Sequence, residues 1–257
     1  MDRASVCIVG ACRDIEPYIH IVLANITTIC SWWHSSQVVI FENDSKDATP
    51  TLLREWISLS DNRILIQESN LDALYPLRTQ RLAYIRNKLV KRVSSSFDYL
   101  LMIDMDDIFN WPVKKESFDS CFDIENWDVI TANSNYCKIW HRNGYYDIWA
   151  LRLPNIIEFD CWDHHTMLLH RGYTYEIALQ KLVIKYMDYM NMIKVPINVN
   201  SAFNGAMICK VPFIKPCCEF IGLEPAHANG MVCEHVSFQN CLRSHGARIV
   251  YNPDFII

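Results

Sequence analysis

Short apolar runs alternate with amphipathic segments along the N-terminal half of the chain. The runs predict buried strands, and the segments between them, apolar at every third or fourth position, predict helices. The predicted strands cover residues 5–10, 37–42 and 63–67, together with a run that ends at Asp104. Near-continuous apolar strands that alternate with helices indicate an α/β fold. We therefore predict a Rossmann-like, mostly parallel central sheet with helices on both faces.

The C-terminal half alternates less regularly. Its apolar runs and periodic segments predict strands at 128–132, 147–151, 206–211 and 248–251, and helices at 173–192 and 234–244. No linker rich in proline, glycine or serine separates the two halves. We therefore expect one continuous domain over residues 1–257.

Composition is that of an ordinary globular protein, with 51% hydrophobic and 21% charged residues. The net charge of −5 argues against nucleic-acid binding, which usually brings a basic surplus. The apolar stretches are too short to span a bilayer and no signal-peptide pattern is visible, so we expect a soluble, cytoplasmic protein.

The eleven cysteines are irregularly spaced, and several lie in apolar, strand-like runs. Such cysteines usually behave as small buried hydrophobes, so we expect mostly reduced thiols. A cluster of potential zinc ligands forms no paired Cys-x-x-Cys pattern, and structural zinc is therefore not favoured. Its members are Cys161, Asp163, His164, His165 and His170, with Cys233 and His235 further on.

Three carboxylates, Asp104, Asp106 and Asp107, follow the fourth predicted strand directly. Carboxylates this close repel one another unless a cation lies between them. Hard divalent cations such as Mn²⁺ or Mg²⁺ prefer oxygen ligands. Strand alternation points Asp104 and Asp106 the same way and Met105 into the core. We predict that this pair binds a metal ion and, through it, a nucleoside diphosphate, with Asp107 near ribose or sugar hydroxyls. The alternative is a solvated acidic turn.

Ligands of parallel sheets bind beyond the carboxyl ends of the strands. Ala11 and Arg13 follow the first predicted strand, and Glu42 and Asp44 follow the second. Glu42 or Asp44 is expected to accept hydrogen bonds from ribose or base, whereas Asp47 suits the turn before the next helix. These residues predict a nucleotide site in residues 1–107, which leaves residues 108–257 for the acceptor.

The predicted helix at 78–93 offers Arg81, Arg86 and Asn87. The planar guanidinium group suits phosphate, although a solvated basic face explains any single arginine equally well. Later in the chain, Glu234 and His235 open a predicted helix, where the helix dipole alone favours a carboxylate. The functional alternative makes Glu234 a general base and His235 a further ligand of metal or phosphate.

Eight segments occur in the order and spacing of a known family. They are VCIVGACRD at 6–14, FENDSKDATPTLLREW at 41–56, RLAYIRN at 81–87, LLMIDMDD at 100–107, YYDIWALR at 145–152, FNGAMI at 203–208, CEHVSF at 233–238 and IVYNPDF at 249–255. In these segments the chain resembles a nucleotide-sugar glycosyltransferase of the GT-A fold. More narrowly, it resembles the fungal capsule-associated alpha-1,3-mannosyltransferase family and its viral and bacterial relatives.

The resemblance implies transfer of a sugar from a UDP- or GDP-sugar to a hydroxyl of a glycan or glycoconjugate. It implies metal at Asp104 and Asp106, and donor contacts from Ala11, Arg13, Glu42, Asp44, Arg81 and Asn87. It also implies that Glu234 and His235 close the site, and that the sugar and acceptor are lined by Asp147, Trp149, Arg152, Asn204 and Gly205. An inverting transfer requires a base, Glu234 or Asp147, whereas a retaining transfer requires neither. Fungal members carry a membrane anchor and none is visible here, so a viral or bacterial enzyme is expected.

Three other classes fit parts of the sequence. IDMDDIF at 103–109 is similar to the signature of haloacid-dehalogenase-type phosphatases, but that motif usually lies near the start of its fold. A sugar nucleotidyltransferase would show a glycine-rich loop after the first strand, where this chain has only Gly10. A carbohydrate-binding module could use the many aromatic residues but would need no metal site.

Overall fold

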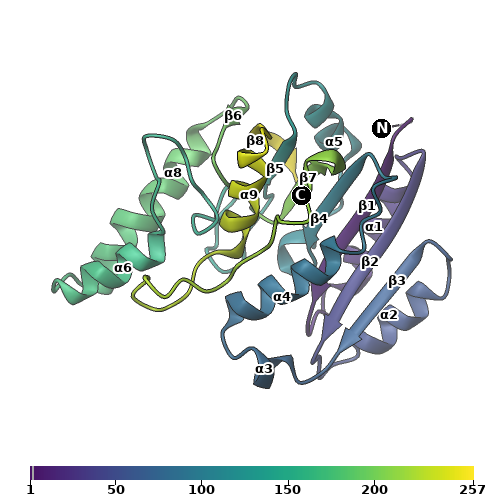
Figure 1. The fold of residues 1–257 in the computed structure, drawn as a ribbon, viewed down its shortest axis with the longest axis horizontal. Helices are drawn as coiled ribbons and strands as arrows, with labels where there is room; N and C mark the ends of the chain where they lie inside the picture. The colour runs from purple at the N-terminus through teal and green to yellow at the C-terminus, as the bar shows by residue number, and fades with distance from the viewer. Residues whose placement is uncertain (2) are drawn as a thin grey trace.

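A mixed eight-stranded sheet runs through the protein (Figure 1), and its strand order is β3-β2-β1-β4-β7-β5-β8-β6. The computed structural model describes residue 1 and residues 3–257. The pairs β1·β2, β2·β3, β1·β4 and β5·β8 are parallel, whereas β7 is antiparallel to β4 and β5, and β6 to β8. The strands are β1 (Ser5–Cys12), β2 (Ser35–Asn43), β3 (Arg63–Glu68), β4 (Tyr99–Asp104), β5 (Val129–Asn133), β6 (Ile197–Asn198), β7 (Ala206–Lys210) and β8 (Ile249–Ile256).

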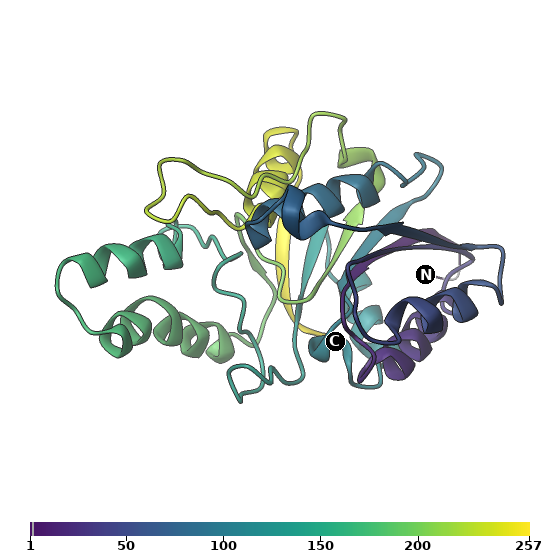
Figure 2. The same ribbon diagram turned by 90° about the horizontal axis from the view of Figure 1, so that it is seen from below.

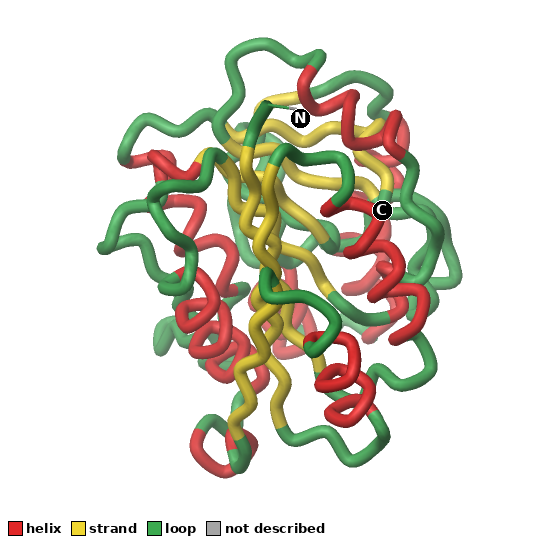
Figure 3. The backbone as a smooth tube through the Cα atoms, turned by 90° about the vertical axis from the view of Figure 1, so that its right-hand side faces the viewer, coloured by secondary structure: helices red, strands yellow, loops and turns green. Residues whose placement is uncertain are grey.

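Helices cover both faces of this sheet, as the sequence predicted (Figures 2 and 3). One apolar cluster joins one face to α1, α2 and α5, and a second joins the opposite face to α4, α8 and α9. The helices are α1 (Ile19–Cys30), α2 (Thr49–Ile57), α3 (Leu71–Leu74), α4 (Arg78–Val90), α5 (Lys115–Phe122), α6 (Cys161–His170), α7 (Tyr175–Leu179), α8 (Lys185–Met192) and α9 (Glu234–Ser244). Short 3₁₀ turns form η1 (Asp107–Phe109) and η3 (Val211–Phe213), and a π-helical turn, η2 (Gln180–Ile184), joins α7 to α8.

Most predicted elements are confirmed. The first four strands and the strands at β5 and β7 agree with their predicted ranges to within two residues, and α9 has its predicted bounds. The helix predicted at 173–192 is the run α7–η2–α8. Local periodicity was sufficient here because each element buries one continuous apolar face.

The C-terminal half differs from the prediction in several features, and its helix α5 and strand β6 were not predicted. The strand predicted at 147–151 is wrong: the Ala150 amide donates to Asp147 Oδ1 at 3.3 Å, and this contact turns the chain. β8 continues past Pro253, because a register shift between Thr131 and Asn133 of β5 accommodates the proline. Helix α6 was not predicted, and Asp160 caps it by accepting from the Trp162 and Asp163 amides.

The expectation of mostly reduced thiols is correct for nine of the eleven cysteines, whereas Cys218 and Cys241 form a disulfide. Within residues 1 and 3–257, no helix has both the length and the apolar character needed to cross a bilayer.

Candidate active site

Strand β4, which lies between β1 and β7, ends at the carboxylate pair, so the pair lies at the carboxyl end of a central strand. Asp104 is the last residue of β4 and pairs in register with Ala11 of β1. Met105 is 1% exposed and lies in the core, so Asp104 and Asp106 face outward together, as alternation predicted. A Cβ on Gly10 would lie 2.5 Å from Met105 Sδ, so Gly10 provides the space for this side chain. Asp106 then caps η1 by accepting from the Ile108 amide at 3.2 Å.

Two cavities meet at this carboxylate pair. One, of about 240 Å³, is lined by Ala11, Arg13 and Asn43 and by arginines of α4. The other, of about 170 Å³, is lined by Asp107, Asp147, Trp149 and the start of α9. The residues common to both are Arg78, Leu82, Arg86, Asp104 and Asp106. We call the first the basic cavity and the second the acidic cavity.

The pKa values of both carboxyl groups of the pair are raised, so positive charge close to them would stabilise their ionised forms. Burial raises the pKa of Asp106 to about 7, and the nearby Asp104 adds to the shift, although the Asp106 side chain still reaches solvent. Burial also raises the pKa of Asp104, while Arg86 and Arg78 act in the opposite direction. A divalent cation would stabilise the ionised forms of two carboxylates whose pKa values are raised in this way.

Arg86 links the two cavities electrostatically. Its Nη2 lies 3.0 Å from Asp104 Oδ1, and its Nη1 forms an ion pair with Glu234 at the start of α9. Arg86 is 6% exposed and Glu234 is 3% exposed. Its guanidinium carbon also lies 5.3 Å from the centre of the Phe203 ring. Glu234 is therefore a buried partner of Arg86, which makes it a poorer free base than the sequence suggested.

His235 lies against the acidic cavity with both ring nitrogens buried and without a hydrogen-bond partner among the described residues. Its ring stacks on Phe203 at a centroid distance of 3.7 Å. Burial, aided by Arg86, lowers its pKa well below the usual value, so the imidazole is neutral and can coordinate a metal. An unpaired buried imidazole that lines the same cavity as two carboxylates is compatible with a divalent cation.

The three proposed metal ligands are not gathered tightly. Over the described part of the chain, only one set of three or more potential ligands has all its ligand atoms within 4.8 Å of one another, and it consists of other residues. At least one separation among Asp104, Asp106 and His235 is therefore longer. Mn²⁺ or Mg²⁺ is compatible with this arrangement, because such ions often take one or two carboxylates, waters and substrate phosphate oxygens.

The predicted donor residues divide into two groups. Ala11, Arg13 and Arg81 line the basic cavity, where both arginines contact Asp72, at 2.8 and 2.9 Å. Glu42, Asp44 and Asn87 line neither cavity. Glu42 accepts from Ser45 and Gln67, Asp44 from the Asn70 and Leu71 amides, and Asn87 exchanges two 2.9 Å hydrogen bonds with the Phe220 backbone. These three side chains hold loops together, because their polar atoms are already used.

The acceptor-side predictions divide in the same way. Asp147 lines the acidic cavity, accepts from the Ala150 and Asn204 amides, and has a pKa raised by burial. Trp149 lines it too, and its indole Nε1 donates to Asp160 at 2.7 Å. Arg152 pairs with Asp160 at 3.3 Å outside this cavity. Asn204 positions the loop, since its Oδ1 accepts from the Tyr146 and Asp147 amides.

Sequence reasoning missed Arg78, which lines both cavities. Arg78, Leu82 and Arg86 are spaced by four residues, so they lie on one face of α4. That spacing could have identified the arginine. Tyr146 and Cys137, which also line the acidic cavity, lie in an irregular loop and carried no comparable pattern.

Comparisons with known proteins bear on the fold. No protein family and no curated protein matches the chain. Among solved structures, a mannosyltransferase from Pyrobaculum calidifontis in complex with GDP-Man and Mn²⁺ matches with a TM-score of 0.53 and 13% identity, over 99% of this chain and 56% of that one. S. aureus TarS 1-349 in complex with UDP matches with a TM-score of 0.55 and 15% identity, over 97% of this chain and 58% of that one. The same protein in complex with UDP-GlcNAc matches with a TM-score of 0.52 and 13% identity, over 97% of this chain and 56% of that one.

At these identities the likeness shows the fold alone. The chain shares the fold of these structures, which is the GT-A fold that the resemblance predicted. It spans somewhat more than half the length of the structures it matches. No match bears on the narrower resemblance to the fungal capsule family.

Proposed function

We propose that this protein transfers a sugar from a nucleoside-diphosphate sugar to a hydroxyl of a glycan or glycoconjugate, with Mn²⁺ or Mg²⁺ bound at Asp104 and Asp106. One observation carries the proposal: a basic cavity and an acidic cavity meet at a carboxylate pair beyond the end of a parallel strand. Such strand ends are where open α/β sheets bind ligands. The proteins with this fold named above, in complex with GDP-Man, UDP or UDP-GlcNAc, support a nucleotide-sugar donor.

The basic cavity suits the donor. Arg13, Arg78, Arg81 and Arg86 line it and would balance the charge of a UDP or GDP diphosphate. Asp104 and Asp106, with His235 as a third candidate, would hold the metal. A bound divalent ion neutralises the charge that develops on a departing diphosphate. Arg86 would assist at the same place, and Glu234 would keep its guanidinium group oriented.

The acidic cavity suits the acceptor. Asp147 is its best candidate for contact with the acceptor hydroxyl, because its pKa is raised and no cation pairs with it in the described residues. In an inverting transfer it would take the hydroxyl proton, and in a retaining transfer it would orient the hydroxyl group. The ring of Trp149 would provide an apolar surface for a sugar.

The alternatives have less support. A haloacid-dehalogenase-type phosphatase would use Asp104 as a nucleophile, but one Asp104 oxygen already pairs with Arg86. A nucleotidyltransferase would need a phosphate-binding loop after β1, and this turn holds Arg13 paired with Asp72 instead. Release of inorganic phosphate from simple phosphomonoesters would favour the phosphatase.

A thermal-shift panel of UDP-, GDP- and dTDP-sugars, with and without Mn²⁺, tests the proposal. A donor at about a hundredfold excess over its dissociation constant adds about 2.7 kcal/mol to the free energy of unfolding. The Asp106→Asn variant should lose the Mn²⁺-dependent part of the shift, and Asp61→Asn, an exposed carboxylate in another turn, should retain it. If no sugar nucleotide stabilises the wild-type chain, the proposal fails.

A further inference from the structure

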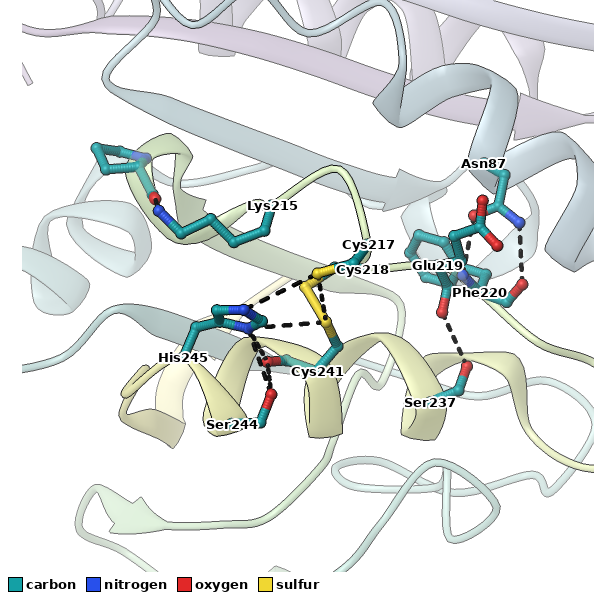
Figure 4. Close-up of a disulfide and its surroundings, with 11 residues drawn as sticks. Asn87, Lys215, Cys217, Cys218, Glu219, Phe220, Ser237, Cys241, Ser244 and His245 are labelled. Carbon is teal, nitrogen blue, oxygen red and sulfur yellow. Dashed lines mark hydrogen bonds between the residues drawn. A yellow bond between two sulfur atoms is a disulfide. The ribbon is translucent and has the colours of Figure 1, made fainter.

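Three sulfur atoms and one imidazole converge beside the C-terminal end of α9 (Figure 4). They belong to Cys217 and Cys218, in the segment that follows η3, and to Cys241 and His245, one helical turn apart at the end of α9. All their ligand atoms lie within 4.8 Å of one another. In the oxidised state Cys218 and Cys241 form a disulfide, and Cys217 keeps a free thiol.

The distances match a tetrahedral metal site. Cys217 Sγ lies 3.9 Å from Cys241 Sγ and 3.9 Å from His245 Nε2. With Zn–S bonds of about 2.3 Å, two sulfurs of a zinc tetrahedron are about 3.8 Å apart. Cys217 and His245 are exposed and Cys241 is partly exposed, so an ion can reach the cluster from solvent.

The hydrogen bonding of His245 favours the tautomer that leaves Nε2 free to bind a metal, although Cys241 Sγ also lies 3.9 Å from Nδ1. Its Nδ1 lies 2.9 Å from the Cys241 carbonyl oxygen, which can only accept, so Nδ1 carries the proton. The lone pair is then on Nε2, the nitrogen that faces Cys217. Histidine ligands of metals usually donate their other N–H to a backbone carbonyl or carboxylate in this way. A disulfide alone requires neither a third cysteine nor an oriented imidazole.

We propose that the reduced chain binds one zinc ion through Cys217, Cys218, Cys241 and His245. A dithiol first reduces the Cys218–Cys241 disulfide: it gives up two electrons and two protons and becomes a disulfide itself. Three thiols and His245 then bind Zn²⁺ and release three protons, leaving three thiolates and a neutral imidazole on the ion. Thiolate and imidazole ligands select zinc over the hard cations expected at Asp104 and Asp106.

The site would anchor the segment that leads into the candidate active site. Just after Cys218, the Phe220 backbone bonds to Asn87 of α4, and the Gly222 carbonyl accepts from Thr79 Oγ1 at 2.6 Å. A Cβ on Gly222 would lie 2.1 Å from the Thr79 carbonyl oxygen, so this packing is close. The same segment ends at Glu234 and His235. The segment between η3 and α9 therefore contacts α4 and leads into the start of α9, and zinc would fix its beginning to the C-terminal end of α9.

Cobalt titration of the full chain, reduced with a phosphine under anaerobic conditions, tests the site. We expect one equivalent of Co²⁺ with a thiolate-to-cobalt charge-transfer band and the intense visible bands of a tetrahedral centre, both abolished by Zn²⁺. The carboxylate site cannot produce the charge-transfer band. Zinc should also raise the thermal midpoint of the reduced chain by about 5 °C.

Cys217→Ser is the decisive variant, because it leaves the Cys218–Cys241 pair intact. It should weaken zinc binding at least about tenfold, as should His245→Ala, whereas Cys30→Ser, a free thiol on α1, should have no effect. Cobalt spectra without a charge-transfer band would overturn the proposal. So would a Cys217→Ser chain that binds zinc as tightly as the wild type.

Discussion

Replacement of Arg86 by methionine should destabilise the protein, because it leaves two carboxylates without their counter-charge. The guanidinium group contacts Asp104 at 3.0 Å and pairs with Glu234. Removing one partner of a buried ion pair costs about 3–5 kcal/mol. The side chain of Glu234 is only 4% exposed, which favours a large loss. That of Asp104 is 28% exposed and can be solvated without Arg86, so we expect a value near the lower limit.

A loss of about 3 kcal/mol corresponds to a thermal midpoint lowered by about 6–12 °C in a chain of this size. Urea unfolding followed by circular dichroism measures the free energy directly. Arg92→Met is the matched control, since Arg92 is exposed just beyond the same helix, and it should change stability by less than about 0.5 kcal/mol.

A double variant separates lost charge pairing from lost packing. If the unpaired Glu234 carboxylate causes the damage, Arg86→Met with Glu234→Gln should be more stable than Arg86→Met alone. Mn²⁺ should also recover part of the loss, because the ion supplies positive charge near Asp104. A single variant within 1 kcal/mol of wild type, or a double variant whose losses simply add, would refute this account.

Two further predictions follow from the same geometry. Burial raises the pKa of Asp147, so its basic form should be lost at a higher pH than for an ordinary carboxyl group. At saturating Mn²⁺, which keeps Asp104 and Asp106 ionised, turnover should then fall as the pH is lowered through the raised pKa of Asp147, and Asp147→Asn should abolish that acid limb; a wild-type rate that is constant down to the usual aspartate range would contradict the role. Gly10→Ala should destabilise the protein by about 1–3 kcal/mol, because the added Cβ would overlap Met105, and should weaken Mn²⁺ binding by displacing the carboxylates on either side. Met105→Ala in the same chain should recover stability, and calorimetry that shows no recovery would exclude overpacking as the cause.

Local pattern was sufficient to predict the N-terminal half of the sheet and the end of β4. Each of these strands is a short apolar run, and alternation across Met105 aligns Asp104 with Asp106 whatever the rest of the fold does. The same reasoning predicted α9 with its bounds, since its apolar positions repeat with the helical period.

Hydrophobic periodicity did not reveal the places where side chains form hydrogen bonds with the backbone of other segments. Asp147 was predicted in a strand because its neighbours are apolar, but its carboxylate accepts from Ala150 and from Asn204, far along the chain. Asn87 was predicted near the donor from the resemblance and from its place on the arginine-bearing helix, and in the structure both ends of its amide bond to Phe220. Hydrogen bonds of this kind leave no periodic trace in a sequence.

The amino-acid sequence by itself determined the class of fold and the position of the carboxylate pair, because both depend on residues close together in the chain. Only the tertiary structure decided that Arg86 joins Asp104 to Glu234, and that Cys217 and Cys218 meet Cys241 and His245. Those contacts depend on how α4, α9 and the segment between η3 and α9 pack against one another. That packing is set by burial of apolar faces across the whole fold, so it cannot be derived from any single stretch of the sequence.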